Sequence, residues 1–263
     1  MKLVRFNMEG ATQRVWVLQH DLYSRQGPIE KTRPIHIMTF AYEVHHELLK
    51  PPKGVERSHL CATLEAKLAC VDHFGASMAE AFFRIPDPNG ESDVASWNHA
   101  AIFVATLEAY LSAIYSSLEV ANLLARTFDA NLKQGFRKMA MSSRAPASLR
   151  FDRWPWLATF YDMRTELCHH GSPLPYIQRE AVVFQITQRH QTHRFEHGKM
   201  VAVSISEIVA FEEGLRAMLD EWASGHLELL DPNLKFRQLV FDASGQNRQG
   251  YDVTLHELMA TRL

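Results

Sequence analysis

The sequence of residues 96–126 is SWNHAAIFVATLEAYLSAIYSSLEVANLLAR. Drawn as a helix, this stretch carries apolar side chains on almost every face: Phe103, Leu107, Tyr110, Leu111, Ile114, Leu118, Ala121 and Leu124. A helix that is apolar on most faces is buried in the middle of a helical protein. The small residues Ser112, Ser116 and Ser117 let neighbouring helices approach closely. We therefore predict the central helix of a bundle over about residues 97–126.

Three further helices are predicted around it. Apolar residues spaced by three and four predict a helix over 58–83, which ends before the turn-forming sequence Pro86-Asp87-Pro88-Asn89-Gly90. A helix over 152–170 is expected to begin with Asp152 as N-cap and Pro155 in its first turn. A helix over 205–223 follows, with the capping-box spacing of Ser204 and Glu207 at its start and Gly225 at its end. The segment 135–148 has no such pattern, so we expect a loop.

Alternating apolar residues predict strands elsewhere. Residues 182–187 and 201–203 alternate with period two, which predicts a β-hairpin with a polar tip over 189–199. Near the N-terminus, Leu3–Phe6 and Val15–Leu18 are candidate short strands and Phe40–Leu49 a candidate helix. The segments Leu234–Phe241 and Tyr251–Leu255 are consistent with a second hairpin.

These elements predict a mainly α protein, a helical bundle with peripheral β-hairpins. The expected organisation is an N-terminal extension over 1–57, a helical core over 58–225 with a hairpin inserted at about 181–205, and a C-terminal extension over 226–263.

The composition is that of a soluble globular protein, with 46% apolar and 22% charged residues in 263. A net charge of -2 argues against coating nucleic acid along the whole surface. We expect neither a membrane span nor a signal peptide, since no apolar run approaches about 20 residues. Three cysteines, Cys61, Cys70 and Cys168, form neither a CxxC pair nor an even disulfide set, which favours the cytoplasm.

One helix end carries candidate chemistry. Residues 161–171 read YDMRTELCHHG, so Arg164 is followed after four residues by His169. A guanidinium offers a fixed charge and donors that match phosphate, and an imidazole titrates near neutrality, so the pair suits phosphodiester cleavage. Ideal helical geometry puts the two residues about 140° and roughly 7.5 Å apart, so they converge only if the arginine bends or the helix opens. The alternative is structural: the two histidines interact with the helix dipole and cap carbonyl groups, and Arg164 pairs with Asp162, Glu166 or an acidic residue of another helix.

An Arg-x4-6-His motif at the end of a core helix, after a serine-rich helix containing Tyr115-Ser116-Ser117-Leu118-Glu119, resembles the HEPN (higher eukaryotes and prokaryotes nucleotide-binding) family. The resemblance covers about residues 96–223. Many members are metal-independent ribonucleases, several of them toxins or defence effectors, and others are binding modules without catalysis. It implies catalytic roles for Arg164 and His169 in a cleft often completed by a second subunit.

Three neighbours of this motif are supporting candidates. Tyr161 lies one turn before the arginine and is placed to donate a hydrogen bond to phosphate. Thr165 occupies the position where catalytic members commonly have Asn, Asp or His, which leaves an enzyme and a catalytically inactive interaction module both open. His170 also satisfies the motif's spacing, so either histidine of the doublet fits.

A positively charged segment precedes the motif. Residues 126–153 contain seven Arg or Lys residues against Asp129 and Asp152. Its weaker candidates for phosphate binding are Arg137, Lys138, Arg150 and Arg153. The alternative is a solvated loop between helices.

The remaining patterns predict no cofactor and no metal. His190, His193 and His197, with Glu196, have spacings that zinc sites use, but they fall on the predicted hairpin tip without a cysteine and favour a solvated turn. No P-loop or dinucleotide-binding fingerprint occurs. The expected partners are RNA or a nucleotide and a second copy of the chain, with a protein partner if the inactive interaction module is correct.

Overall fold

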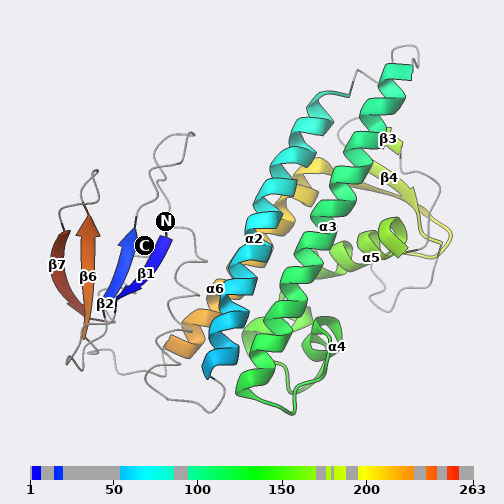
Figure 1. Cartoon of the computed structure of the whole chain (residues 1–263). Coiled ribbons are helices and arrows are strands. Elements are labelled where there is room, and N and C mark those ends of the chain that lie inside the picture. The colour runs from blue at the N-terminus through cyan, green and yellow to red at the C-terminus, as the bar shows by residue number, and fades with distance from the viewer. Residues whose placement is uncertain are drawn as a thin grey trace. The chain divides into compact units, whose positions relative to one another are not determined.

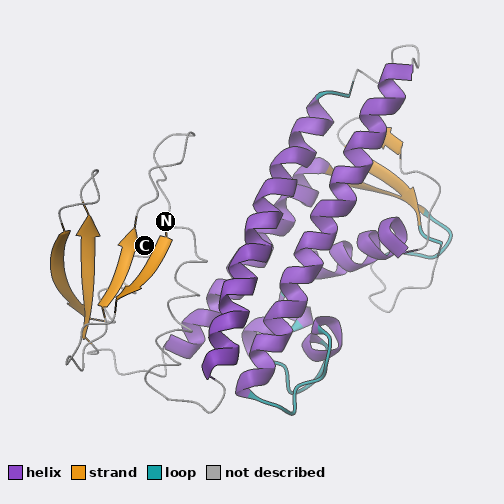
Figure 2. Ribbon diagram, viewed as in Figure 1, coloured by secondary structure: helices purple, strands orange, loops and turns teal. Residues whose placement is uncertain are grey.

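The computed structural model describes residues 2–6, 15–19, 54–85, 94–169, 176–178, 181–187, 195–227, 235–241 and 248–254. The chain forms two compact units: one comprises Val55–Leu219, and the other comprises Met1–Gly54 with Asp220–Leu263. The larger unit is mainly helical and the described elements of the other are mainly strands (Figures 1 and 2). The predicted mainly α class is thus confirmed.

The long helices α2 (Gly54–Phe83) and α3 (Val94–Phe128) lie side by side and antiparallel in Figure 1. At one end, the buried Arg57 of α2 donates to the hydroxyl of Thr127 (2.9 Å) and to its carbonyl oxygen (2.7 Å). At the other end, the rings of Phe82 and Phe103 lie 5.7 Å apart. The two contacts fix both ends of the pair.

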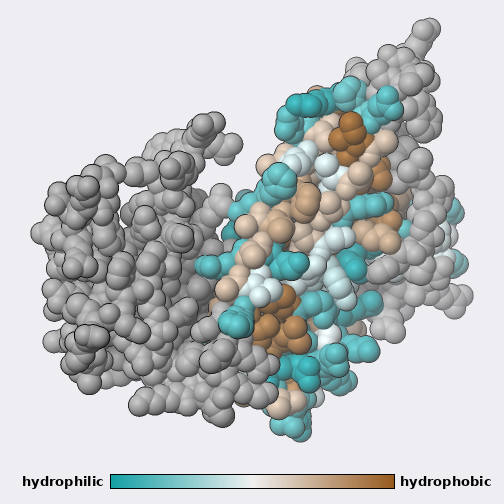
Figure 3. Space-filling view, viewed as in Figure 1, coloured by the Kyte–Doolittle hydropathy of each residue, from teal (hydrophilic) through white to brown (hydrophobic). Residues whose placement is uncertain are grey.

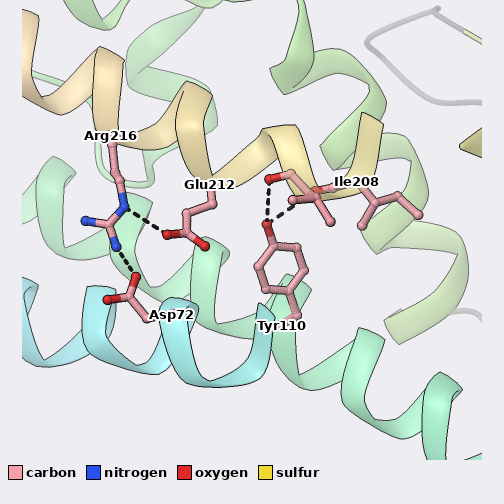
Figure 4. Close-up of polar contacts among 6 residues, drawn as sticks. Asp72, Tyr110, Ile208, Glu212 and Arg216 are labelled. Carbon is pink, nitrogen blue, oxygen red and sulfur yellow. Dashed lines mark hydrogen bonds and ion pairs between the residues drawn. The ribbon is translucent and has the colours of Figure 1, made fainter. Parts of the chain in front are cut away.

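Helix α6 (Ile205–Leu227) joins this pair through polar contacts that Figure 4 shows. The hydroxyl of Tyr110 on α3 donates to the Ile208 carbonyl oxygen at 3.2 Å. Arg216 pairs with Asp72 on α2 and, at 3.0 Å, with Glu212 one turn earlier on its own helix. Burial raises the pKa of Glu212, and a hydrogen bond with Asp72 raises it further, whereas Arg216 lowers it.

Helix α5 (Trp156–His169) packs between α3 and α6. Its Phe160 lies 5.9 Å from Phe211 of α6, and its Tyr161 lies 6.4 Å from Tyr115 of α3, both edge to face. Helix α3 therefore contacts α2, α5 and α6, as its apolar surface predicted. Its most deeply buried side chains include Phe103, Leu107, Leu111, Ile114, Leu118 and Leu124.

The start of α5 corrects the prediction that the helix begins near Asp152. Residues Ala147–Leu149 and Phe151–Arg153 form two short 3-10 helices, η1 and η2. Trp154 then adopts φ -121° and ψ 88° because a residue that precedes proline is driven out of the helical region. Pro155 therefore lies just outside α5, and Asp152 pairs with Arg150 at 2.8 Å.

Two further boundaries differ from the predictions. The expected loop over 135–148 contains a short helix, α4 (Phe136–Ala140), which buries Phe136, Met139 and Ala140. Helix α6 runs past Gly225 to Leu227, since glycine within a helix only lowers its stability and need not end it. The Ser204 hydroxyl accepts a hydrogen bond from the Glu207 N–H at 3.1 Å, as the capping box predicted.

The hairpin between α5 and α6 is confirmed and enlarged. Strands β4 (Ala181–Gln185) and β5 (Met200–Ser204) pair antiparallel, and β3 (Tyr176–Gln178) adds a third strand beside β4. The buried carboxylate of Glu166 fixes α5 to this sheet by accepting from the N–H (2.9 Å) and hydroxyl (2.6 Å) of Thr187.

The strands predicted near both chain ends form a single sheet. It contains β1 (Lys2–Phe6), β2 (Val15–Gln19), β6 (Lys235–Phe241) and β7 (Arg248–Thr254) in the order β1-β2-β6-β7. The neighbours β2 and β6 pair in parallel, and the other two pairs are antiparallel. The helix predicted over 40–49 lies outside the described residues.

Helix α3 also qualifies as a membrane span by length and composition, over Asn98–Phe128 with a mean hydropathy of 1.4, which the sequence reading did not expect. Half of its most apolar 18-residue window is buried inside the protein. Figure 3 shows apolar surface on the face formed by α2 and α3. Large exposed apolar side chains of these helices are Phe83, Ile102 and Leu123.

Candidate functional site

Polar side chains on the apolar helix α3 hold the turn that leads into α4. Asn122 is buried, donates to the Lys133 carbonyl oxygen at 3.0 Å and accepts from the Gly135 N–H at 2.9 Å. One turn earlier, the Glu119 carboxylate accepts from the Phe136 N–H at 3.2 Å. Gly135 has φ 85°, a conformation that favours glycine. These hydrogen bonds hold the turn before α4, and the first residue of α4, against α3.

The short helix α4 places two cations beside α3. Its apolar residues Phe136, Met139 and Ala140 are buried in the larger unit. Arg137 and Lys138 lie between them in the sequence and line a cavity instead. Helix α5 supplies the opposite wall with Tyr161, Arg164 and Thr165, whose spacing of three and four residues places them on one helical face.

The cavity between α3, α4 and α5 has a volume of about 600 Å³, within the range of small-molecule sites. Its lining comprises Tyr115, Glu119, Gln134, Gly135, Arg137, Lys138, Met141, Tyr161, Arg164 and Thr165. Three of these side chains are cations and one is a carboxylate, so the cavity favours an anion. We call it the α3–α4–α5 cavity.

Two of the cations stack on the two tyrosine rings. The Arg164 guanidinium carbon lies 3.6 Å from the centre of the Tyr115 ring, and that of Arg137 lies 5.5 Å from the centre of the Tyr161 ring. The tyrosine rings themselves meet at 87°. A cation over an aromatic face is attracted by the ring's negative face, so this packing fixes both guanidinium groups.

The environment keeps both phenols protonated. Burial raises the pKa of Tyr161 far above its usual range, the charges of Glu119 and Tyr115 raise it further, and Arg137 and Arg164 oppose them. Burial also raises the pKa of Tyr115, as do the charge of Glu119 and a hydrogen bond with it, against the effect of Arg164. At neutral pH these phenols are hydrogen-bond donors rather than bases.

Arg164 acts on one more titratable group along α5. Burial raises the pKa of the Cys168 thiol, and the nearby positive charge of Arg164 lowers it. Glu108 raises this pKa, and a hydrogen bond with Ser112 lowers it. Arg164 therefore lines the cavity and also acts electrostatically on Cys168, one turn further along α5.

The structure brings five of the predicted site residues into one cavity: Arg164, Tyr161, Thr165, Arg137 and Lys138. The Thr165 hydroxyl donates to the Tyr161 carbonyl oxygen at 2.7 Å, so its contribution to the cavity is as an acceptor or as packing. Among the weaker phosphate candidates, Arg150 and Arg153 are exposed and do not line this cavity.

The two histidines lie at the edge of the described region. His169 is the last residue of α5, one turn beyond Thr165, and only its backbone is described. His170 lies outside the described residues. The assignment of a proton-transfer residue thus stays a prediction.

Sequence reasoning missed Tyr115 and Glu119 as site residues. They are four residues apart on α3 and so share a face, and both are half-buried. A polar pair at this spacing in an otherwise apolar helix was the available signal. Gln134 and Met141 are exposed residues at the rim and had no distinguishing signal.

Across the ranges that the structure describes, no three side chains of His, Cys, Asp or Glu gather as a metal site. His190 and His193 of the histidine-rich segment fall outside those ranges, and His197 and Glu196 are exposed. The chemistry available in the α3–α4–α5 cavity is therefore that of fixed cations, phenol donors and one carboxylate.

No family model, curated protein or solved structure matches this chain.

Proposed function

We propose that the chain is a HEPN-like protein whose α3–α4–α5 cavity binds RNA or a nucleotide through its phosphate groups. The supporting observation is that Arg137 and Lys138 meet Arg164 in one cavity, although they come from different helices. Guanidinium groups match the geometry of phosphate oxygens, and a lysine adds a point charge.

The proposal has a catalytic form, a metal-independent endoribonuclease. The RNA 2′-oxygen attacks the adjacent phosphorus, the bond from phosphorus to the 5′-oxygen breaks, and the products end in a 2′,3′-cyclic phosphate and a 5′-hydroxyl. Arg164 stabilises the charge that develops on the phosphate. His169 takes the proton from the 2′-hydroxyl or gives one to the 5′-oxygen.

Equilibrium binding of labelled single-stranded RNA in EDTA tests the binding proposal. Arg164→Gln should weaken binding by about tenfold, since it removes a charge-assisted contact. Arg150→Gln is the matched control because Arg150 is an exposed arginine that pairs with Asp152 away from the cavity. Equal affinities of wild type and Arg164→Gln would contradict the proposal.

The same mixtures, followed over time, test the catalytic form. Cleavage in EDTA should fall by about 10²–10⁴-fold in His169→Ala, and RNA with 2′-deoxyribose at the cleaved position should be inert. His170→Ala distinguishes the two histidines of the doublet. RNA binding without cleavage would reject the catalytic form and retain the proposal that the cavity binds RNA. A folded chain that binds no RNA would favour the alternative, a catalytically inactive HEPN-like scaffold for a protein partner.

A further inference from the structure

Two residues that line the α3–α4–α5 cavity carry buried donors that lack acceptors within the described part of the chain. These donors are the Nε and Nη2 atoms of Arg137 and the hydroxyl of Tyr161, whose side chain is only 3% exposed. In folded proteins most buried donors are paired, because an unpaired one loses its hydrogen bond to water without a replacement. Such a set of donors in a cavity indicates a ligand that accepts hydrogen bonds.

The chemistry of these donors indicates an oxyanion. Nε and Nη2 form the side edge of a guanidinium, and the two parallel N–H groups of that edge bind two oxygens of one phosphate or carboxylate. The Tyr161 phenol stays protonated because its pKa is raised, so its hydroxyl donates to a third acceptor atom or to a shared one. Arg137 and Arg164 both act electrostatically on this phenol, against a larger opposing effect of the Glu119 carboxylate.

Charge and burial distinguish between kinds of phosphate. Arg137, Lys138 and Arg164 outnumber the single carboxylate of Glu119 by two charges in the cavity lining. A phosphate monoester carries about -1.5 to -2 charges at pH 7, whereas an internal phosphodiester carries a single one. The donors are also fully covered by protein atoms, so the end of a ligand reaches them more readily than a link in the middle of a strand.

We propose that the cavity recognises a terminal phosphate monoester, held by the side edge of Arg137 and the Tyr161 hydroxyl. This inference rests on the proposed function and specifies its ligand. The exposed side chains Gln134, Lys138 and Met141 form the rim of the cavity. The same phosphate chemistry occurs at the end of an RNA strand, in a nucleoside monophosphate and in inorganic phosphate.

Calorimetric titration with matched ligands tests this inference. One single-stranded RNA is prepared with a 5′-phosphate, with a 3′-phosphate and with hydroxyl groups at both ends, and a nucleoside monophosphate is compared with its nucleoside. We expect a phosphate-ended ligand to bind about tenfold or more tightly than its hydroxyl-ended counterpart, since its charge-assisted hydrogen bonds are additional. Comparison of the 5′-phosphate and 3′-phosphate RNAs identifies which end of the strand the cavity binds. Inorganic phosphate should compete with the phosphate-ended RNA.

Three variants locate the effect. Arg137→Gln and Tyr161→Phe should weaken the binding of phosphate-ended RNA much more than that of hydroxyl-ended RNA, and so abolish or strongly reduce the preference for a phosphate end. Arg137→Lys keeps the charge but lacks the side edge, so it should also lose most of the preference even if the glutamine variant misfolds. Arg150→Gln, outside the cavity, should keep the full preference.

The outcomes separate this inference from the proposed function. Tight RNA binding that is independent of terminal phosphate, and that Arg137→Gln weakens equally for all ligands, would overturn the inference and retain the RNA site. Binding of nucleoside monophosphate without any RNA binding would support the monoester site and reject RNA as the ligand. No binding of any phosphate ligand by the folded chain would overturn both.

Discussion

Replacing Tyr161 by phenylalanine should stabilise the free protein while it weakens phosphate binding. The ring is buried and packs against Phe160 (5.2 Å between ring centres), Phe151 (6.0 Å) and Tyr115 (6.4 Å), all contacts that phenylalanine keeps. Only the hydroxyl is lost, and none of the described residues accepts its hydrogen bond. The substitution therefore removes a buried polar group and no described hydrogen bond.

The size of the effect follows from the burial of that hydroxyl. An unpaired buried polar group costs about 1–3 kcal/mol. We expect Tyr161→Phe to raise the unfolding free energy by about 1 kcal/mol. In a unit of this size, such a change raises the melting temperature by about 2–4 °C.

Urea denaturation and thermal melting measure this change, and Tyr110→Phe is the matched control. Tyr110 is equally buried, but its hydroxyl donates to the Ile208 carbonyl oxygen, so its loss should destabilise by about 0.5–1.5 kcal/mol. With a phosphate-ended RNA in excess, wild type should gain more stability than Tyr161→Phe. A Tyr161→Phe variant that is less stable than wild type by 1 kcal/mol or more would refute the reasoning, because its hydroxyl would then have a partner in the folded chain.

Three other predictions concern packing, pH and assembly. Gly214→Ala should destabilise the protein by about 1–3 kcal/mol, because the added Cβ would lie 2.6 Å from the Trp156 side chain. Gly225→Ala on the same helix is the control: its added Cβ meets nothing within 4 Å, so this variant should be more stable than wild type by up to about 1 kcal/mol. Similar melting temperatures of the two variants would contradict this prediction. Burial raises the folded-state pKa of Glu212 above its ordinary value of 4.5. Protonated Glu212 therefore contributes its full share of the unfolding free energy below pH 4.5, and this contribution is lost as the pH rises through the raised pKa. Glu212→Gln should flatten the pH dependence of urea midpoints between neutrality and 4.5, and an unchanged dependence would count against the role of Glu212. The family resemblance predicts a homodimer, the commonest closed assembly, and sedimentation as a monomer at tens of micromolar would exclude it.

Apolar residues that recur at helical spacing predicted the main helices correctly. The stripe Leu64, Leu68, Val71 and Met78 is buried in α2, and Ile208, Leu215, Met218 and Trp222 are buried in α6. These predictions succeeded because a helix that buries one face must repeat apolar residues at its own period. Elements whose stability comes from distant contacts were missed. Helix α4 is only five residues long and is held by Asn122 and Glu119 of α3, which no local pattern reveals.

The same distinction applies to the site and to the sheet. Arg164 and Tyr161 were predicted as site residues because a helix end carries a recognisable motif. Tyr115 and Glu119 join them only through the packing of α3 against α5, which sequence spacing does not specify. Likewise, each strand near the chain ends was predicted locally, but the parallel pairing of β2 with β6 joins segments from the two ends of the chain. Such pairing has no local signal in a single sequence.

The salt dependence of RNA binding tests most directly the claim that the α3–α4–α5 cavity contacts phosphate. Each phosphate neutralised on a single strand contributes about -0.7 to the slope of log Kobs against log salt concentration. Titrations of single-stranded RNA at several salt concentrations should give Arg164→Gln a slope about 0.7 smaller in magnitude than wild type, with weaker binding throughout. Arg150→Gln should match wild type. Identical slopes and affinities for wild type and Arg164→Gln, or a larger loss in Arg150→Gln, would contradict the claim.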